Sequence, residues 1–342
     1  MGLGAIPTTF FRSYLSQRQQ FTVIGDSSSS LNNINCGVPQ GSVLGPILFL
    51  VYINDLSRCT NNCRIRMFAD DTCMDIHDVD IDSLLINAER ETSKIFDWCL
   101  SNKLTINSTK TCFIIFHGIK KYVPNDLNSI NVGEIKISRV KTAPYLGLLF
   151  DECLTWKDHV SHVCKSLLKY FGIFNHIKHI INKKLARQIY FSFIYSRIKY
   201  GLEIYGSCSN NLLNKVQIIQ NKLLKMLLRL EIRTSTNELH KTLKLLKVQD
   251  IYNVNILNFV NNCINGNCPD PYKTYFVTRE SGYNIRGMGL QVNNGKTNIG
   301  ASAVKIYGAK LWNNLDHEIK RNSHKKCFKK YLVSHFINYY DY

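Results

Sequence analysis

The stretch Phe68-Ala69-Asp70-Asp71-Thr72 decides how the rest of this chain is interpreted. Residues 64–67 before it alternate polar and apolar side chains, which is typical of a half-buried strand. Residues 72–77 after it can return as a second strand. The sequence therefore predicts a tight β-hairpin that carries two neighbouring carboxylates at its tip.

Two adjacent carboxylates repel each other, which costs free energy. A bound divalent cation removes this electrostatic cost. Carboxylate oxygens are ligands that Mg²⁺ prefers, and a pair on a rigid tip suits phosphoryl transfer with Mg²⁺ or Mn²⁺. The alternative is an ordinary solvated turn, because Asp is a common turn residue. The pair alone does not decide between these interpretations, and the residues upstream do.

A glycine-rich loop precedes the hairpin by about 30 residues. It reads Cys36-Gly37-Val38-Pro39-Gln40-Gly41-Ser42-Val43-Leu44-Gly45-Pro46 and runs into an apolar stretch that ends at Ile53. Ser42 can cap the following helix, and Pro46 fits its first turn. A glycine-rich loop before a helix N-terminus suits a phosphate or nucleotide, although no Lys-Ser/Thr pair follows as in a P-loop. The alternative is a simple turn before a buried helix.

Together, the loop, the segment Tyr52-Ile53-Asn54-Asp55-Leu56 and the Ala-Asp-Asp hairpin resemble the palm of reverse transcriptases. The most similar pattern is that of non-LTR retrotransposons, the jockey-like LINE elements. The resemblance implies that the hairpin supplies catalytic carboxylates and that the loop contacts the incoming nucleotide and the template. The residues it assigns are Asp70 and Asp71 for catalysis and metal binding, and Pro39, Gln40, Gly41 and Phe68 for nucleotide and template.

Two further motifs follow the hairpin. Lys110, before a strand at 112–116, resembles the family's lysine that is thought to protonate the pyrophosphate leaving group; the alternative is a surface lysine. Tyr145-Leu146-Gly147 resembles the turn of a hairpin that grips the primer; the alternative is a plain hairpin that closes the sheet. Between them, apolar spacing predicts a helix that Asp82 caps and that runs to about Ser101.

The fold class expected is α+β. Residues 1–155 would form a partial polymerase palm, an antiparallel sheet with helices on one face, beginning with a helix at 9–18. Residues 156–260 would form a helical thumb, with helices near 157–178, 183–199 and 211–230. In the second of these, Ala186, Ile189, Tyr190, Phe193 and Ile194 are expected to face the core. Residues 261–342 would form a loop-rich linker up to about 300 and a C-terminal helical segment.

The net charge of the chain indicates the kind of partner that it binds. The chain of 342 residues has 43 Lys and Arg against 25 Asp and Glu, a net charge of +18, so a nucleic acid partner is expected. The resemblance specifies an RNA template, a DNA primer and deoxynucleoside triphosphates. The 12 cysteines show no zinc-finger spacing, and no signal peptide or membrane span is apparent. Reduced thiols in the cytoplasm or nucleus are therefore expected, with no membrane partner.

The chain departs from the family upstream of the loop. In the family, this upstream region contains the fingers and then a strand that carries the first catalytic Asp. In this sequence about 35 residues precede Gly37, and Asp26 is the only acidic residue among them. The expectation is therefore a fragment of an RNA-directed DNA polymerase that is inactive by itself. A catalytically inactive nucleic-acid-binding remnant and a gene that is rarely or never translated are the alternatives.

Overall fold

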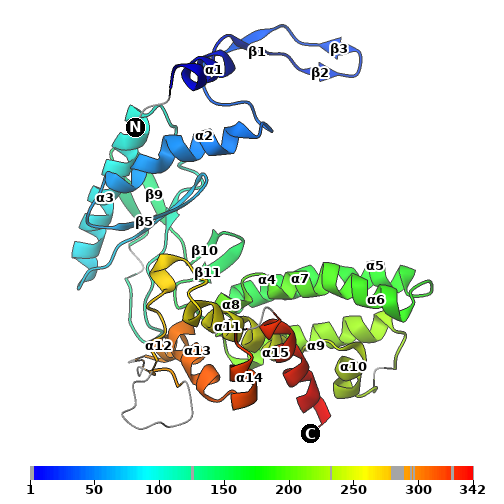
Figure 1. The fold of residues 1–342 in the computed structure, drawn as a ribbon. Helices are drawn as coiled ribbons and strands as arrows, with labels where there is room; N and C mark the ends of the chain where they lie inside the picture. The colour runs from blue at the N-terminus through cyan, green and yellow to red at the C-terminus, as the bar shows by residue number, and fades with distance from the viewer. Residues whose placement is uncertain are drawn as a thin grey trace. The chain divides into compact units, whose positions relative to one another are not determined.

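The computed structural model describes residues 4–124, 127–231, 233–278, 289–292, 295, 297–324 and 327–341. The chain divides into two compact units. Unit 1 comprises Met1–Phe113 and Asp126–Arg139, and unit 2 comprises Ile114–Asn125 and Val140–Tyr342. Strands and helices occur in both (Figure 1), so the mixed helix-and-strand fold class is confirmed.

Unit 1 combines three longer helices with short antiparallel ribbons and one three-stranded sheet. The order along the chain is α1 (Ala5–Leu15), β1 (Arg18–Gln20), β2 (Val23–Ile24), β3 (Ser27–Ser28), β4 (Asn32–Ile34), α2 (Leu44–Ile53), η1 (Asn54–Arg58), β5 (Arg64–Phe68), β6 (Asp71–Asp75), α3 (Ile81–Ser101), β7 (Cys112–Phe113), β8 (Ser129–Val132) and β9 (Ile135–Arg139).

The core of unit 1 lies between α3 and the sheet β7-β9-β8. β9 pairs antiparallel with β8 and parallel with β7. Ile95 and Phe96 of α3 pack with Ile130 of β8 and Ile137 of β9, and Ile53 at the end of α2 joins this cluster. The expected helix over residues 82–101 is confirmed as α3, but Asp80 caps it, accepting a hydrogen bond from the Ser83 N–H at 2.8 Å.

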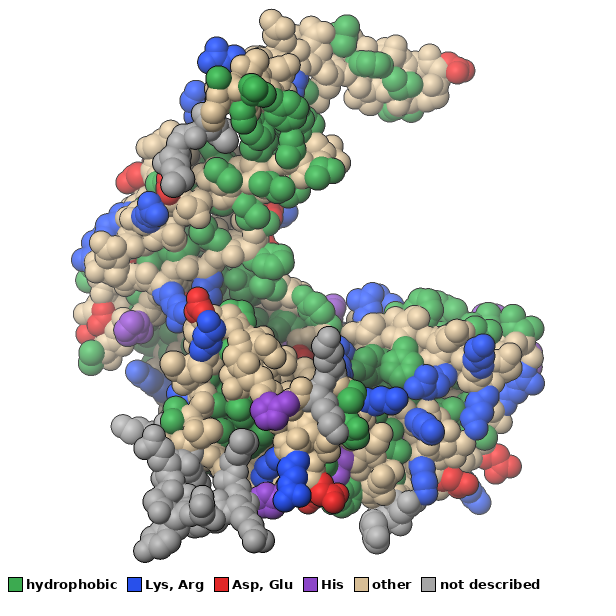
Figure 2. Space-filling model, viewed as in Figure 1, with side chains coloured by type: hydrophobic (Ala, Val, Ile, Leu, Met, Phe, Trp, Pro, Cys, Tyr) green, Lys and Arg blue, Asp and Glu red, His purple; other side chains and the backbone are tan. Residues whose placement is uncertain are grey.

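Many apolar side chains of unit 1 remain at its surface (Figure 2). Helix α2 is apolar on every side, yet among its residues only Gly45 and Ile53 are buried. Val51 is 70% exposed. An exposed apolar surface of this kind is typical of a region that another part of an assembly covers.

The longer segment of unit 2 begins with a hairpin and continues as a helical bundle (Figure 1). Its elements are β10 (Thr142–Tyr145), β11 (Leu148–Asp151), α4 (Lys157–Leu168), α5 (Tyr170–Ile177), α6 (Lys183–Ile189), η2 (Tyr190–Tyr195, a π-helix), α7 (Ser196–Lys199), α8 (Leu202–Tyr205), α9 (Asn210–Leu227), α10 (Thr236–Leu243), α11 (Val248–Ile264), η3 (Asp270–Tyr272), α12 (Asn298–Ser302), α13 (Val304–Asn313), α14 (His317–Arg321), α15 (Phe328–Asn338) and η4 (Tyr339–Asp341).

One hydrophobic core runs through unit 2 from Leu148 to Tyr340. Helix α11 contributes to it along its whole length and contacts α9, α13 and α15. The C-terminal helices therefore share a core with the segment expected to form the thumb. None of the described helices has the length and apolar character that a membrane span requires.

Further local expectations are wrong. The strand expected at 112–116 is shorter and forms only β7, Cys112–Phe113. The first helix ends at Leu15, and Arg18 starts strand β1. The loop expected from residue 261 begins later, because α11 continues to Ile264. Phe193, expected in the core, is 47% exposed. Parts of the expected linker, residues 279–288, 293–294 and 296, lie outside the described residues.

Candidate active site

The predicted hairpin forms from β5 and β6 in unit 1. The two strands pair antiparallel, and Phe68 lies opposite Asp71, so Ala69 and Asp70 make a two-residue turn. Ala69 has φ of 52°, in the left-handed region that a residue with a Cβ rarely adopts. Backbone strain of this kind is found most often at functional sites. The hairpin prediction is confirmed, and the catalytic role of its tip stays a prediction.

The two faces of the hairpin have different surroundings. Ile65, Met67 and Met74 pack against the core of unit 1. Asp70 and Asp71 are exposed at the tip, beside Phe68, which is 63% exposed. The core contacts hold the strands in register because a one-residue slip would exchange the two faces. The carboxylates thus lie on a fixed tip and remain free to reach a ligand in solvent.

A buried carboxylate anchors the segment that leads into β5. Glu91 on α3 is fully enclosed and accepts hydrogen bonds from Thr60, Asn62 and Lys94. Arg90 Nε also donates to it, at 3.0 Å. Burial by itself would raise the pKa of Glu91, but these hydrogen bonds lower it to about 2. The carboxylate is therefore charged and joins α3 to the start of the hairpin.

The glycine-rich loop adopts the backbone that its sequence suggests. Gly37 and Gly41 have φ of 75° and 82°. The Ser42 hydroxyl accepts a hydrogen bond from the Gly45 N–H at 3.1 Å and donates one to the Pro39 carbonyl at 2.8 Å. The predicted cap is thereby confirmed, and Pro46 lies in the first turn of α2 as expected. A Cβ on Gly45 would lie 2.9 Å from Ser42 Oγ, so this turn needs glycine there.

Sequence reasoning missed one residue that fixes this loop. The Arg18 guanidinium donates to the Gly37 carbonyl at 2.6 Å and to the Cys36 carbonyl at 3.3 Å. Its Nε donates to the Leu15 carbonyl at 3.2 Å. Arg18 therefore ties the end of α1 to the loop. No local sequence signal marks it, because its partners in the loop lie 18 and 19 residues further along the chain.

The donors at the hairpin tip suit a hard divalent cation. Mg²⁺ is often held by one or two carboxylates, with waters and substrate phosphates completing its shell, and Asp70 and Asp71 supply such a pair. Among the described residues, no group of three or more His, Cys, Asp or Glu side chains could hold a metal ion. Lys110 lies in an exposed turn of unit 1 just before β7.

The second predicted hairpin forms from β10 and β11 in unit 2. Tyr145 lies opposite Leu148, which leaves Leu146 and Gly147 as the turn. Both have positive φ, 46° and 76°, as a type I′ turn requires. Close to the turn, the Leu149 N–H donates to Nδ1 of the buried His159 at 3.3 Å. The hairpin prediction is confirmed, whereas primer gripping stays a prediction.

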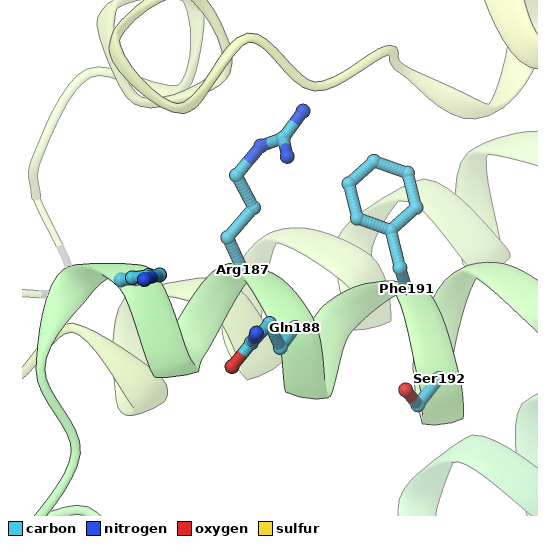
Figure 3. A pocket seen from close by; sticks show the side chains of 5 residues that line it. Arg187, Gln188, Phe191 and Ser192 are labelled. Atoms are coloured by element: carbon cyan, nitrogen blue, oxygen red, sulfur yellow. The ribbon is translucent and has the colours of Figure 1, made fainter.

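Unit 2 also has a basic pocket on its surface. The pocket has a volume of about 370 Å³ and is lined from α6 and η2. Arg187 and Phe191 extend from the same side of the helix (Figure 3), and the guanidinium lies 4.8 Å from the ring centre. Basic side chains beside an exposed aromatic ring are a combination to which a nucleic acid strand can bind, through its phosphates and by base stacking. The residues that line the pocket are Lys184, Arg187, Gln188, Phe191 and Ser192.

Comparison with known proteins shows which family this chain resembles. Residues 4–150 match the family described as reverse transcriptase (RNA-dependent DNA polymerase). This segment contains the glycine-rich loop, the Asp70-Asp71 hairpin and the β10–β11 hairpin. Residues 4–150 are therefore similar to the reverse transcriptase domain.

The relatives that match are RNA-directed DNA polymerases of mobile elements. The chain is 27% identical over 260 residues, 72% of its length, to a probable RNA-directed DNA polymerase from transposon X-element of Drosophila melanogaster. It is 24% identical over 249 residues, 70% of its length, to the RNA-directed DNA polymerase from mobile element jockey of the same species. The matches cover 28% and 27% of these relatives, so the chain spans less than a third of their length. No solved structure matches the chain.

Proposed function

We propose that this chain supplies the palm and thumb of an RNA-directed DNA polymerase that copies an RNA template from a DNA primer. The reverse transcriptase match over residues 4–150, with the exposed carboxylate pair inside it, carries the proposal. In this assignment residues 1–155 belong to the palm and 156–260 to the thumb. The described residues between 261 and 341 include members of the same hydrophobic core.

Each predicted residue has one task in the reaction. Asp70 and Asp71 would hold Mg²⁺ or Mn²⁺, which supplies positive charge to the attacking and leaving oxygens. Lys110 would donate a proton to the leaving pyrophosphate. Pro39, Gln40 and Gly41 would contact the nucleotide and the template, together with Phe68. Tyr145, Leu146 and Gly147 would contact the primer.

The net charge of +18 supports a duplex partner. The basic residues of unit 2 are arranged for phosphate contacts, since Lys184 and Arg187 line the pocket beside an exposed aromatic ring. Figure 2 shows Lys and Arg side chains along the helices of this unit. Phosphate contacts of this kind position a nucleic acid without reading its sequence.

Primer extension tests the proposal. The chain is joined to the preceding part of the X-element relative and given an RNA template, a DNA primer and Mg²⁺. Asp70→Asn or Asp71→Asn should lower extension by at least about 10²-fold, because charge stabilisation at the reacting oxygens is lost. Asp82→Asn, at an exposed site on α3, changes charge equally and should leave extension unchanged. Retained extension in the Asp70 variant would refute the site assignment.

Two further measurements separate the roles. The chain by itself should bind the duplex without extending it, because two-metal chemistry needs more carboxylates than the hairpin tip provides. Robust extension by the chain alone would show that another acid completes the site. In the joined protein, Lys110→Ala should slow extension by about 10²-fold with unchanged template affinity, as loss of a general acid does.

A further inference from the structure

We infer that Tyr200 is the positioning residue of the β10–β11 turn, and that it sets how this turn meets the 3′ end of the primer. The inference rests on the proposed function, because it assumes that the turn contacts the primer. Tyr200 lies between α7 and α8, 53 residues beyond Gly147 and outside every recognised motif. The turn and Tyr200 both belong to unit 2.

The turn has a conformation that it does not hold easily by itself. Leu146 has φ of 46°, in the left-handed region that disfavours a branched, bulky residue. Such a residue persists where its surroundings impose the conformation. The structure provides one such constraint, because the Tyr200 hydroxyl donates to the Leu146 carbonyl at 2.7 Å.

The ring of Tyr200 adds a second contact. A Cβ on Gly147 would lie 3.1 Å from Tyr200 Cε1, closer than nearly all real Cβ contacts. Tyr200 therefore covers the glycine of the turn from one side, and glycine is the residue that allows this approach. Hydroxyl and ring together hold both residues of the turn.

The neighbouring residue fixes Tyr200 itself. Gly201 has φ of 66°, and a Cβ there would lie 2.5 Å from Cδ2 of Leu148, the first residue of β11. Leu148 is only 4% exposed and belongs to the core of unit 2. The chain at Tyr200-Gly201 thus packs directly against the hairpin. Tyr200 is nevertheless 59% exposed, so packing of the core does not explain its hydroxyl contact.

A photo-crosslinking experiment tests the inference on the chain as it exists. The probe is an RNA–DNA duplex whose primer ends in 4-thiothymidine, and crosslinked peptides are mapped by mass spectrometry. The variants are Tyr200→Phe, which keeps the ring, and Tyr200→Ala, which loses both contacts. The control is Tyr339→Phe, at a tyrosine that is 56% exposed in the same unit.

With wild-type protein we expect crosslinks within residues 145–148. Tyr200→Phe should reduce them about fivefold, the factor that corresponds to one lost hydrogen bond, and Tyr200→Ala should reduce them further. Overall duplex affinity should change less than twofold. Hydrogen exchange at the turn should become faster in both variants, without duplex, while the α9 and α11 amides keep their protection.

The possible outcomes test the positioning role of Tyr200 separately from the proposed primer contact of the turn. Wild-type crosslinks that persist at full strength in both Tyr200 variants would overturn the positioning role and leave the primer contact intact. A wild-type complex that binds the duplex but forms no crosslink at the turn would refute the primer contact itself, and the inference with it. A parallel loss in the Tyr339 control would show a general effect of losing a hydroxyl and would also overturn the inference.

Discussion

Replacing Glu91 by Gln should lower the stability of unit 1, which carries the β5–β6 hairpin of the candidate active site. Glu91 is the enclosed carboxylate of α3 that binds the segment leading into β5, through Thr60 and Asn62. Lys94 Nζ donates to its two oxygens at 2.9 and 3.0 Å. A Gln side chain has the same shape but loses the charge, and its amide nitrogen cannot accept any of these hydrogen bonds.

The size of the effect follows from the pKa of Glu91. Hydrogen bonding outweighs burial and lowers this pKa from 4.5 to about 2, which corresponds to about 3 kcal/mol at about 1.4 kcal/mol per unit. The side chain of Glu91 is enclosed, but those of Arg90 and Lys94 are 53% and 40% exposed. Solvent screens these partners, so we expect Glu91→Gln to cost about 2 kcal/mol of unit 1 stability at neutral pH.

The sign of the pH dependence is fixed by the direction of the shift. Because the folded-state pKa lies below the unfolded value, the carboxylate stabilises the fold fully above pH 4.5. That contribution is lost as the pH falls from 4.5 towards 2. The difference in stability between wild type and Glu91→Gln should therefore be constant near neutrality and shrink over this acid range.

Native-state hydrogen exchange measures the difference in the right place, because peptides from α3 and from β5–β6 report on unit 1 alone. Asp97→Asn, at an exposed position on the same helix, is the matched control and should change protection little. A Glu91→Gln effect below about 0.5 kcal/mol, the size of an ordinary surface substitution, would refute the reasoning. So would an effect that is the same at pH 7 and pH 3.

Three other predictions follow from single features. Duplex affinity should fall with salt, and log K against log salt concentration should have a slope of roughly −4 for about five phosphate contacts. Lys184→Ala or Arg187→Ala should each reduce the magnitude of this slope by about 1. Binding that does not depend on salt would contradict a phosphate interface. Gly41→Ala should cost about 1 kcal/mol in hydrogen exchange of the loop, since Gly41 has φ of 82°; unchanged protection would argue against the turn. Burial lowers the pKa of His159 from 6.5 to about 4, so the protection factor of the Leu149 amide in hydrogen exchange should decrease as the pH falls through that range, because protonation removes the acceptor of its N–H. His159→Gln should abolish this trend, and a trend that survives would assign it to another group.

Local patterns predicted the elements that local chemistry determines. Alternation of polar and apolar residues located the β5–β6 hairpin, and helical spacing located α3 to its last residue, Ser101. The Ser42 cap was also predictable, because its partner Gly45 lies three residues away. Hydrogen bonds and side-chain repeats of this range are visible in the sequence itself.

In the helix expected at 183–199, the helical period led to a wrong prediction of one core residue. Phe193 shares the spacing of the buried residues Tyr190 and Ile194, yet it is 47% exposed. The chain forms a π-helix at Tyr190–Tyr195, which winds more residues per turn and rotates the following side chains away from the expected face. Tertiary packing determines such a change, and periodicity does not reveal it.

Helix α11 was not predicted as an element because its sequence has no amphipathic pattern. Its buried residues, from Val248 to Cys263, include Val254, Asn255, Ile256 and Leu257 in succession, and no residue of the helix is exposed. A search for an amphipathic stripe fails on a helix that is surrounded by the core. Asn261 is a buried polar residue of the helix and donates to the Ser323 carbonyl at 3.1 Å.

The motif loops owe their shape to residues outside the motifs. At Gly37 and at Leu146 the backbone is left-handed, and at each of these residues a side chain distant in sequence bonds the carbonyl. Arg18 bonds the carbonyl of Gly37, and Tyr200 bonds the carbonyl of Leu146. Motif residues can be recognised because their chemistry is local, but a carbonyl accepts from any donor that the fold brings near, so the donor leaves no signature in the sequence. A search for functional residues in related chains should therefore include the side chains that bind the carbonyls of motif loops, even where those side chains lie in unremarkable segments.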